Sequence, residues 1–192
     1  MAAGKYRTIV ADPPWEYDEG FANNPKPGTK GWKPLPYPSM SVWEICALPI
    51  SRMADRDCRL FLWTTNRYLR DAFMVIDAWG FKYAQALVWH KTGNPSPFGG
   101  SVAPIHAEFL LVAKRGKPES LGRLDSSVIA ANVQDHSAKP EGFLDYIETI
   151  SPGPYLELFA RRNRFGWETW GNESFEHVDL GVTETVRTAE VA

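Results

Sequence analysis

The first structured stretch of the chain reads YRTIVADPPW, residues 6 to 15. Residues 6–11 are mostly β-branched or apolar, which is typical of a buried strand. The two prolines that follow end the strand, fix their own φ angles and bias Asp12 away from the helical region. In α/β proteins ligands bind where strands end. The stretch therefore predicts a buried strand and a rigid turn that presents an acid, Asp12, at a ligand site.

Strand-like and helix-like segments alternate along the rest of the chain. Ser41 and Glu44 have capping-box spacing and predict a short helix that Pro49 ends. Asn66 is a candidate cap for a second helix, which Gly80 ends, and a third helix is expected over residues 140–150. Further strands are expected at residues 59–64, 83–90, 108–113, 155–160 and near 167–170.

This alternation predicts an α/β fold with a mostly parallel sheet, Rossmann-like in architecture. No G-x-G-x-x-G fingerprint follows any of the strands. We expect a single domain over residues 1–175, because 192 residues suffice for one core. Residues 16–40 are rich in Pro, Gly and Asn and predict a mobile active-site loop. Residues 92–105 predict a substrate-side loop, and residues 176–192 a flexible tail.

Composition limits the classes of function. The formal net charge is -2, so the chain is not expected to coat nucleic acid by charge alone, although a local basic face would still guide a strand. Two cysteines and four histidines show no zinc-ligand spacing, so no metal is expected. The sequence shows neither a signal peptide nor a membrane-spanning run, which predicts a cytoplasmic protein without membrane contact.

The Asp12-Pro13-Pro14-Trp15 turn suits chemistry on an aromatic amine such as N6 of adenine, whose lone pair is delocalised into the ring. A carboxylate that accepts one amine hydrogen and a backbone carbonyl that accepts the other would localise this lone pair. Asp12 supplies the carboxylate, Pro13 the carbonyl, and Trp15 an aromatic face for the base. The alternative interpretation is a plain turn with an exposed acid and a core tryptophan.

The ordered motifs of the chain resemble the MT-A seventy family of adenine-N6 methyltransferases, which includes the catalytic subunit of the eukaryotic messenger-RNA enzyme and has bacterial and phage members. The resemblance spans residues 10–173. It rests on ADPPW (11–15), LPYPSM (35–40), LFLWTTNR (60–67), VWHKTG (88–93), HSAKPEGF (136–143), SPGPYLELFAR (151–161) and WGNE (170–173). It implies a Rossmann-like fold in permuted order, in which the catalytic loop precedes the main cofactor-binding strand.

The resemblance also implies roles for individual residues. The turn Asp12, Pro13, Pro14 and Trp15 would be catalytic, and Asp12 would also contact S-adenosylmethionine. The other residues implied to bind this cofactor are Lys139, Phe159, Arg161, Asn163, Asn172 and Glu173. The residues implied to contact the substrate are Trp15, Tyr37, Glu108 and Lys139.

Six basic side chains are either phosphate contacts or ordinary surface charges. They are Lys26, Lys30, Lys33, Arg161, Arg162 and Arg164.

Together these features predict an enzyme that transfers a methyl group from S-adenosylmethionine to adenine N6 in nucleic acid, DNA rather than RNA, without a metal. The chain has no room for a separate recognition domain, and a homodimer would supply the missing surface. We expect a bacterial or phage origin. The alternatives are a catalytically silent nucleic-acid-binding subunit with the same fold, an RNA N6-adenosine methyltransferase and a small-molecule methyltransferase. Intact Asp12 and Lys139 argue against the silent subunit.

Overall fold

The computed structural model describes residues 4–17, 39–93, 102–133, 139–140, 142–171 and 178–181. The predicted site residues Tyr37, Asn172 and Glu173 lie outside these ranges, as do Lys26, Lys30 and Lys33. The same holds for most of the predicted active-site loop, for residues 94–101 of the substrate-side loop and for most of the tail.

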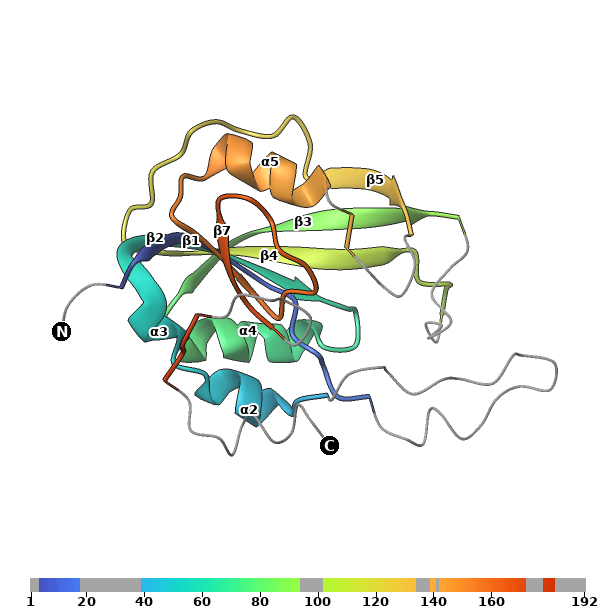
Figure 1. The fold of residues 1–192 in the computed structure, drawn as a ribbon. Helices are drawn as coiled ribbons and strands as arrows, with labels where there is room; N and C mark the ends of the chain where they lie inside the picture. The colour runs from blue at the N-terminus through green and yellow to red at the C-terminus, as the bar shows by residue number, and fades with distance from the viewer. Residues whose placement is uncertain are drawn as a thin grey trace.

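A twisted sheet of seven strands runs through the middle of the described structure (Figure 1). Its strands are β1 (Tyr6–Ala11), β2 (Ala54–Thr64), β3 (Lys82–Thr92), β4 (Ala107–Arg115), β5 (Val128–Asn132), β6 (Tyr155–Leu158) and β7 (Trp167–Trp170). Their order is β5-β3-β4-β2-β1-β6-β7, and β4 is antiparallel to both of its neighbours while the other described pairs are parallel. The prediction of a mostly parallel sheet is confirmed.

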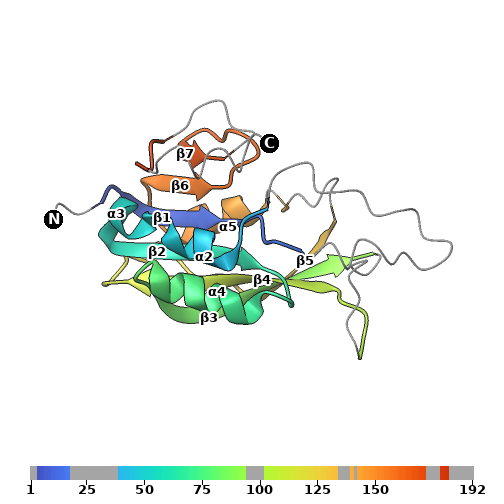
Figure 2. The same cartoon turned by 90° about the horizontal axis from the view of Figure 1, so that it is seen from below.

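Helices cover both faces of this sheet. Helix α5 (Gly142–Ile150) packs on one face, and α2 (Val42–Ala47), α3 (Ile50–Met53) and α4 (Leu69–Ala78) lie on the other, as Figures 1 and 2 show. Two buried clusters follow from this layering, and β1 contributes to both of them: Ile9 faces the α2–α4 side and Val10 faces α5. A strand buried on both faces is expected at the centre of an α/β sheet.

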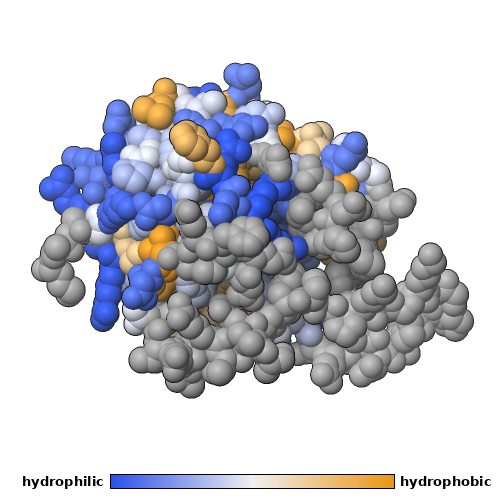
Figure 3. Space-filling model, viewed as in Figure 1, coloured by the Kyte–Doolittle hydropathy of each residue, from blue (hydrophilic) through white to orange (hydrophobic). Residues whose placement is uncertain are grey.

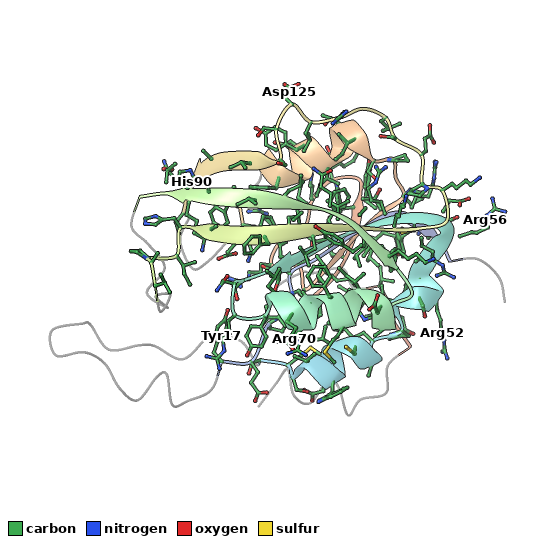
Figure 4. All side chains as sticks on the ribbon, turned by 180° about the vertical axis from the view of Figure 1, so that it is seen from behind. Tyr17, Arg52, Arg56, Arg70, His90 and Asp125 are labelled. Carbon is green, nitrogen blue, oxygen red and sulfur yellow. The ribbon has the colours of Figure 1, made fainter. Side chains whose placement is uncertain are left out.

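The antiparallel direction of β4 decides which residues reach the functional edge of the sheet. The carboxyl ends of β1, β2, β3 and β6 share one edge, and the amino end of β4 joins them, because Phe109 pairs with Thr64 and Ala107 with His90. Glu108 therefore lies beside residues that follow β1 and β2. In Figure 4 Tyr17 and His90 lie toward this edge, whereas Arg56 lies at the opposite end. We call it the carboxyl edge.

Two of the predicted helix ends are confirmed by their local geometry, and one is wrong. Ser41 and Glu44 form the predicted capping box at α2. Gly80 ends α4 with a φ of 79°, a left-handed conformation that suits glycine. Asn66 is not the cap of α4, because residues 66–68 form a turn and Tyr68 is the N-cap of the helix.

Two elements were not predicted, namely α3 and the edge strand β5. The β5 sequence VIAAN has few β-branched residues and is only half buried, so its pattern in the sequence is weak.

On the face viewed in Figure 3, apolar side chains form separate patches in a mostly hydrophilic surface.

The capping box at α2 gives a stability prediction. Ser41→Ala removes the oxygen that accepts the hydrogen bond from the Glu44 amide, and we expect the free energy of unfolding to fall by about 1 kcal/mol. Urea unfolding measures the change. The matched control is Ser51→Ala in α3, an exposed helical position that we expect to be neutral. Equal losses in both variants would show that the cap contributes nothing specific.

Candidate active site

The Asp-Pro-Pro-Trp turn leaves β1 at the carboxyl edge and is held at both sides by backbone hydrogen bonds. The Trp15 amide donates to the Pro13 carbonyl at 2.9 Å, and the Met40 amide donates to the Pro14 carbonyl at 2.8 Å. The Pro13 carbonyl, expected to accept from an amine, therefore already accepts one hydrogen bond, and its second lone pair is the one left for a ligand. These bonds fix the position of Asp12 at the end of β1.

Trp15 is buried beneath this turn. Its side chain is 4% exposed, its Nε1 donates to the Trp63 carbonyl at 3.3 Å, and its ring stacks on Tyr68 with the centroids 5.2 Å apart. A base would need an exposed indole face. The stacking role expected for Trp15 therefore stays a prediction, and the geometry supports a role as an anchor of the turn.

Lys139 lies next to Asp12, as the resemblance implied. Its Nζ donates to both carboxylate oxygens of Asp12 at 2.8 Å and lies 3.4 Å from Oε2 of Glu108. Burial alone would lower the pKa of Lys139, but the carboxylates of Asp12 and Glu108 outweigh it and raise the pKa above its usual value. Lys139 therefore stays protonated and cannot accept a proton at neutral pH.

Glu108 is held between two ammonium groups. It pairs with Lys139 and, through Oε1, with Lys91 at the end of β3. Burial would raise the pKa of Glu108, but Lys139 and Lys91 outweigh burial and lower it, so the carboxylate is ionised. Lys91, Glu108, Lys139 and Asp12 form a row of alternating charges across β3, β4 and β1, which we call the charge row. Sequence reasoning missed Lys91, whose only signal was its place in VWHKTG.

A small cavity of about 60 Å³ opens beside the charge row. It is lined by Val10, Asp12, Trp63, Lys139, Pro140, Phe143, Leu144, Glu157, Phe159, Arg161 and Arg162. Of the predicted cofactor residues, the cavity brings together Asp12, Lys139, Phe159 and Arg161. Phe159 has a φ of 62°, which is unusual for a residue with a side chain and is common at functional sites.

Two other residues after β6 have different surroundings. Asn163 is exposed and does not line the cavity. Arg164 bonds to Glu148 and Asp145 of α5, so its guanidinium holds the β6–β7 connection against this helix and is not presented to a phosphate.

Glu157 is the second residue that sequence reasoning missed. It sits in the middle of β6 and lines the cavity, and its Oε2 is buried without a hydrogen-bond partner among the described residues. Burial raises the pKa of Glu157 to about 7, against the opposing effect of Arg162 and with a further increase from Asp12. A carboxylate so placed fits a ligand that brings a positively charged hydrogen-bond donor.

The fold and this cavity define the class of protein. A mostly parallel α/β sheet with an acid at the end of its central strand, and with a cavity lined by charged side chains at the same edge, fits an S-adenosylmethionine-dependent methyltransferase. The chain belongs to the MT-A70 family, which matches it over residues 6–173. Members of this family use S-adenosylmethionine as the methyl donor.

Individual relatives support this placement. The chain is 34% identical to the Type II methyltransferase M.MunI of Mycoplasma sp over 188 residues, covering 88% of this chain and 78% of the relative. It is 32% identical to the N(6)-adenosine-methyltransferase MT-A70-like protein of Drosophila melanogaster, with 88% and 27% covered. It is 30% identical to the METTL3 catalytic subunit of Homo sapiens, with 88% and 28% covered. The chain thus spans about a quarter of the eukaryotic relatives.

Two other features are absent from the part of the chain that the structure describes. The described residues include no group of three or more His, Cys, Asp or Glu placed to hold a metal ion. Nor does any helix in the described part of the chain have the length and apolar character needed to cross a membrane.

The buried carboxylate of Glu157 predicts a stability cost that depends on pH. An acid whose pKa is raised in the folded state loses stability as the pH rises from its unfolded pKa, near 4.3, to its folded pKa, here about 7. Glu157→Gln should therefore raise the free energy of unfolding little at pH 4.5 and by roughly 1–3 kcal/mol at pH 8. Urea unfolding of both proteins at the two pH values measures this difference. An equal gain at both values would contradict the assignment.

Proposed function

We propose that the chain methylates the N6 amine of adenine in DNA, with Asp12 as the residue that contacts the amine. The observation that carries the proposal is the Asp12 carboxylate, fixed at the end of β1, bonded by Lys139 and open to the cavity. As a methyl group bonds to the amine nitrogen, positive charge develops there, and a nearby carboxylate stabilises it. S-adenosylmethionine supplies the methyl group on a sulfonium when it is bound.

Lys139 and Glu108 have supporting roles in this proposal. The Lys139 ammonium balances the charge of Asp12 and orients both of its oxygens, while Glu108 and Lys91 hold Lys139 from the other side. Since Lys139 stays protonated, the methylated amine releases its proton to solvent. The transfer is then a direct displacement that produces S-adenosylhomocysteine, methylated adenine and a proton.

The remaining site residues take the roles that their family resemblance implies. Phe159, Arg161 and Asn163 would contact the cofactor, and so would Asn172 and Glu173. Tyr37 would form a wall of the adenine pocket. Of these six residues, Phe159 and Arg161 have structural support, because both line the cavity.

We propose two segments as movable parts of the site. The predicted active-site loop, residues 16–40, would cover the adenine, and residues 92–105 would contact the strand. Support comes from their described ends: Tyr17 donates or accepts a hydrogen bond with Thr65 at the carboxyl edge, and β3 ends at Thr92 on the same edge. The proposed domain covers residues 1–175, with residues 176–192 as a tail.

DNA is the proposed polymer because a Type II methyltransferase is similar over 78% of its own length, whereas the N(6)-adenosine-methyltransferases match over about a quarter of theirs. We also propose a homodimer and a cytoplasmic location. Trp43, 73% exposed on α2, is an apolar side chain available to a partner. The free thiols of Cys46 and Cys58 fit a reducing compartment.

Charge removal at Asp12 tests the proposed role directly. Asp12→Asn keeps the shape of the side chain but removes its charge, and we expect methyl transfer to fall by about 10²- to 10³-fold. Lys139→Met should give a comparable loss, because it leaves two carboxylates without their shared ammonium. The measurement is incorporation of labelled methyl groups into matched DNA and RNA oligonucleotides. The control is Asp125→Asn. Asp125 is exposed and lies at the top of Figure 4, so we expect this variant to keep the activity of the wild type.

Each result separates the competing interpretations. Faster labelling of DNA than of RNA by the wild-type protein supports the proposal, and labelling of RNA alone would contradict the choice of polymer. Cofactor binding without labelling of either polymer would favour the silent subunit. Full activity of Asp12→Asn would refute the role of this carboxylate.

A further inference from the structure

Glu157 differs from the other carboxylates that line or border the cavity. Asp12 bonds to Lys139, and Glu108 bonds to Lys91 and Lys139, so both have cationic partners inside the protein. Oε2 of Glu157 is buried and has no hydrogen-bond partner among the described residues. The charge row is neutral by itself, with two cations and two anions, and Glu157 lines the cavity together with two further cations, Arg161 and Arg162.

A carboxylate is unexpected at the position that Glu157 occupies in β6. Leu156 and Leu158, its neighbours in the strand, are fully buried on the side of α2 and α4. Glu157 points to the opposite face, where it pairs in register with Val10 and lines the cavity with Phe143 of α5. An apolar side chain would fit this face, and a carboxylate with a buried oxygen that accepts no hydrogen bond from the described residues costs stability there. A cost of this kind at a cavity indicates a ligand that offsets it.

The charged groups around Glu157 do not neutralise it. Asp12, after β1, raises its pKa, and Arg162 and Arg164, after β6, lower it, but burial has the largest effect. Arg164 is bonded to Glu148 and Asp145, and Lys139 to Asp12. Lys139 and Arg164 are therefore already bonded to other carboxylates. The effect of Arg162 on the pKa of Glu157 is smaller than the effect of burial.

We propose that Glu157 binds the methionine end of S-adenosylmethionine by accepting a hydrogen bond from its α-ammonium group. This inference rests on the proposed function and deepens it. Among the groups of the cofactor, the ammonium has both a positive charge and N–H donors; the sulfonium has no donor, and the donors of ribose and adenine are neutral. The cavity of about 60 Å³ is small, so we assign it to the amino-acid end and not to the whole cofactor.

This assignment separates the tasks of two carboxylates in one cavity. Glu157 takes the ammonium of the cofactor, so Asp12 remains available to the adenine amine. It also links binding to pH, because the ammonium favours the ionised form of Glu157, whose pKa without ligand is about 7. Cofactor affinity should therefore increase as the pH rises from 6 to 8.

Two ligands distinguish the ammonium from the rest of the cofactor. S-adenosylhomocysteine keeps the amino-acid end, whereas 5′-methylthioadenosine keeps the nucleoside and lacks that end. We would measure the affinity of both by titration calorimetry for the wild-type protein, Glu157→Gln and the control Glu168→Gln. Glu168 lies on the neighbouring strand β7, outside the cavity, and has its own partners Lys5 and Tyr6.

We expect Glu157→Gln to weaken S-adenosylhomocysteine binding by about tenfold or more, and to leave 5′-methylthioadenosine binding unchanged. The affinity of Glu157→Gln should also lose its dependence on pH between 6 and 8. Glu168→Gln should bind both ligands as the wild type does. If Glu157→Gln binds S-adenosylhomocysteine more weakly but has a higher free energy of unfolding at pH 8, misfolding is excluded as the cause. Loss of a structural role would lower both the affinity and the free energy of unfolding.

Three results would overturn the proposal. Equal losses for both ligands would place Glu157 at the nucleoside, and no loss for either would remove it from the site. A wild-type protein that binds neither ligand would exclude a cofactor site in this cavity. None of these results depends on methyl transfer, so a protein that binds S-adenosylhomocysteine through Glu157 but methylates no adenine would refute the proposed function alone.

Discussion

The ion pair between Lys139 and Asp12 is the interaction on which the arrangement of this site depends. Two carboxylates, Asp12 and Glu108, share one ammonium group in a partly buried place, where like charges would otherwise oppose each other. Lys139 contacts both of them, and Lys91 contacts Glu108 from the other side. The sheet topology makes this contact possible, because β4 is antiparallel and its first residues reach the edge where β1 ends.

Rigidity of the Asp-Pro-Pro-Trp turn follows from the core beneath it. Trp15 is buried against Tyr68 and bonded to the Trp63 carbonyl, and the Pro14 carbonyl bonds to Met40. The acid that chemistry would use is thus held by packing on one side and by the charge row on the other. Such preorganisation avoids the cost of reorienting groups during the reaction.

The sequence predicted the parts of the fold that local patterns determine. β1 and the turn after it, the capping box at Ser41 and the glycine end of α4 were all visible as local signals. The weak edge strand β5 was not, because its residues lack a clear periodicity. The start of α4 was misplaced at Asn66, since a polar residue near a helix start need not be its cap.

The site residues divide in a similar way, into those that the sequence indicated and those that only the structure revealed. Lys139 beside Asp12 came from the family resemblance, and the structure brings the two together across 127 positions of sequence. Lys91 and Glu157 were not predicted, because a single Lys or Glu in a strand does not indicate a functional site until its burial and its neighbours are known. The stacking of Trp15 on a base stays a prediction, and the burial of its indole could not be derived from a tetrapeptide.

The most direct test of the account is to incubate the wild-type protein with a DNA duplex and S-adenosylmethionine that carries a deuterated methyl group. The DNA is then digested and its nucleosides are identified by mass spectrometry. The account predicts deuterated N6-methyl-2′-deoxyadenosine as the labelled nucleoside. Label on cytosine, or label absent from deoxyadenosine although the protein binds the cofactor, would contradict it.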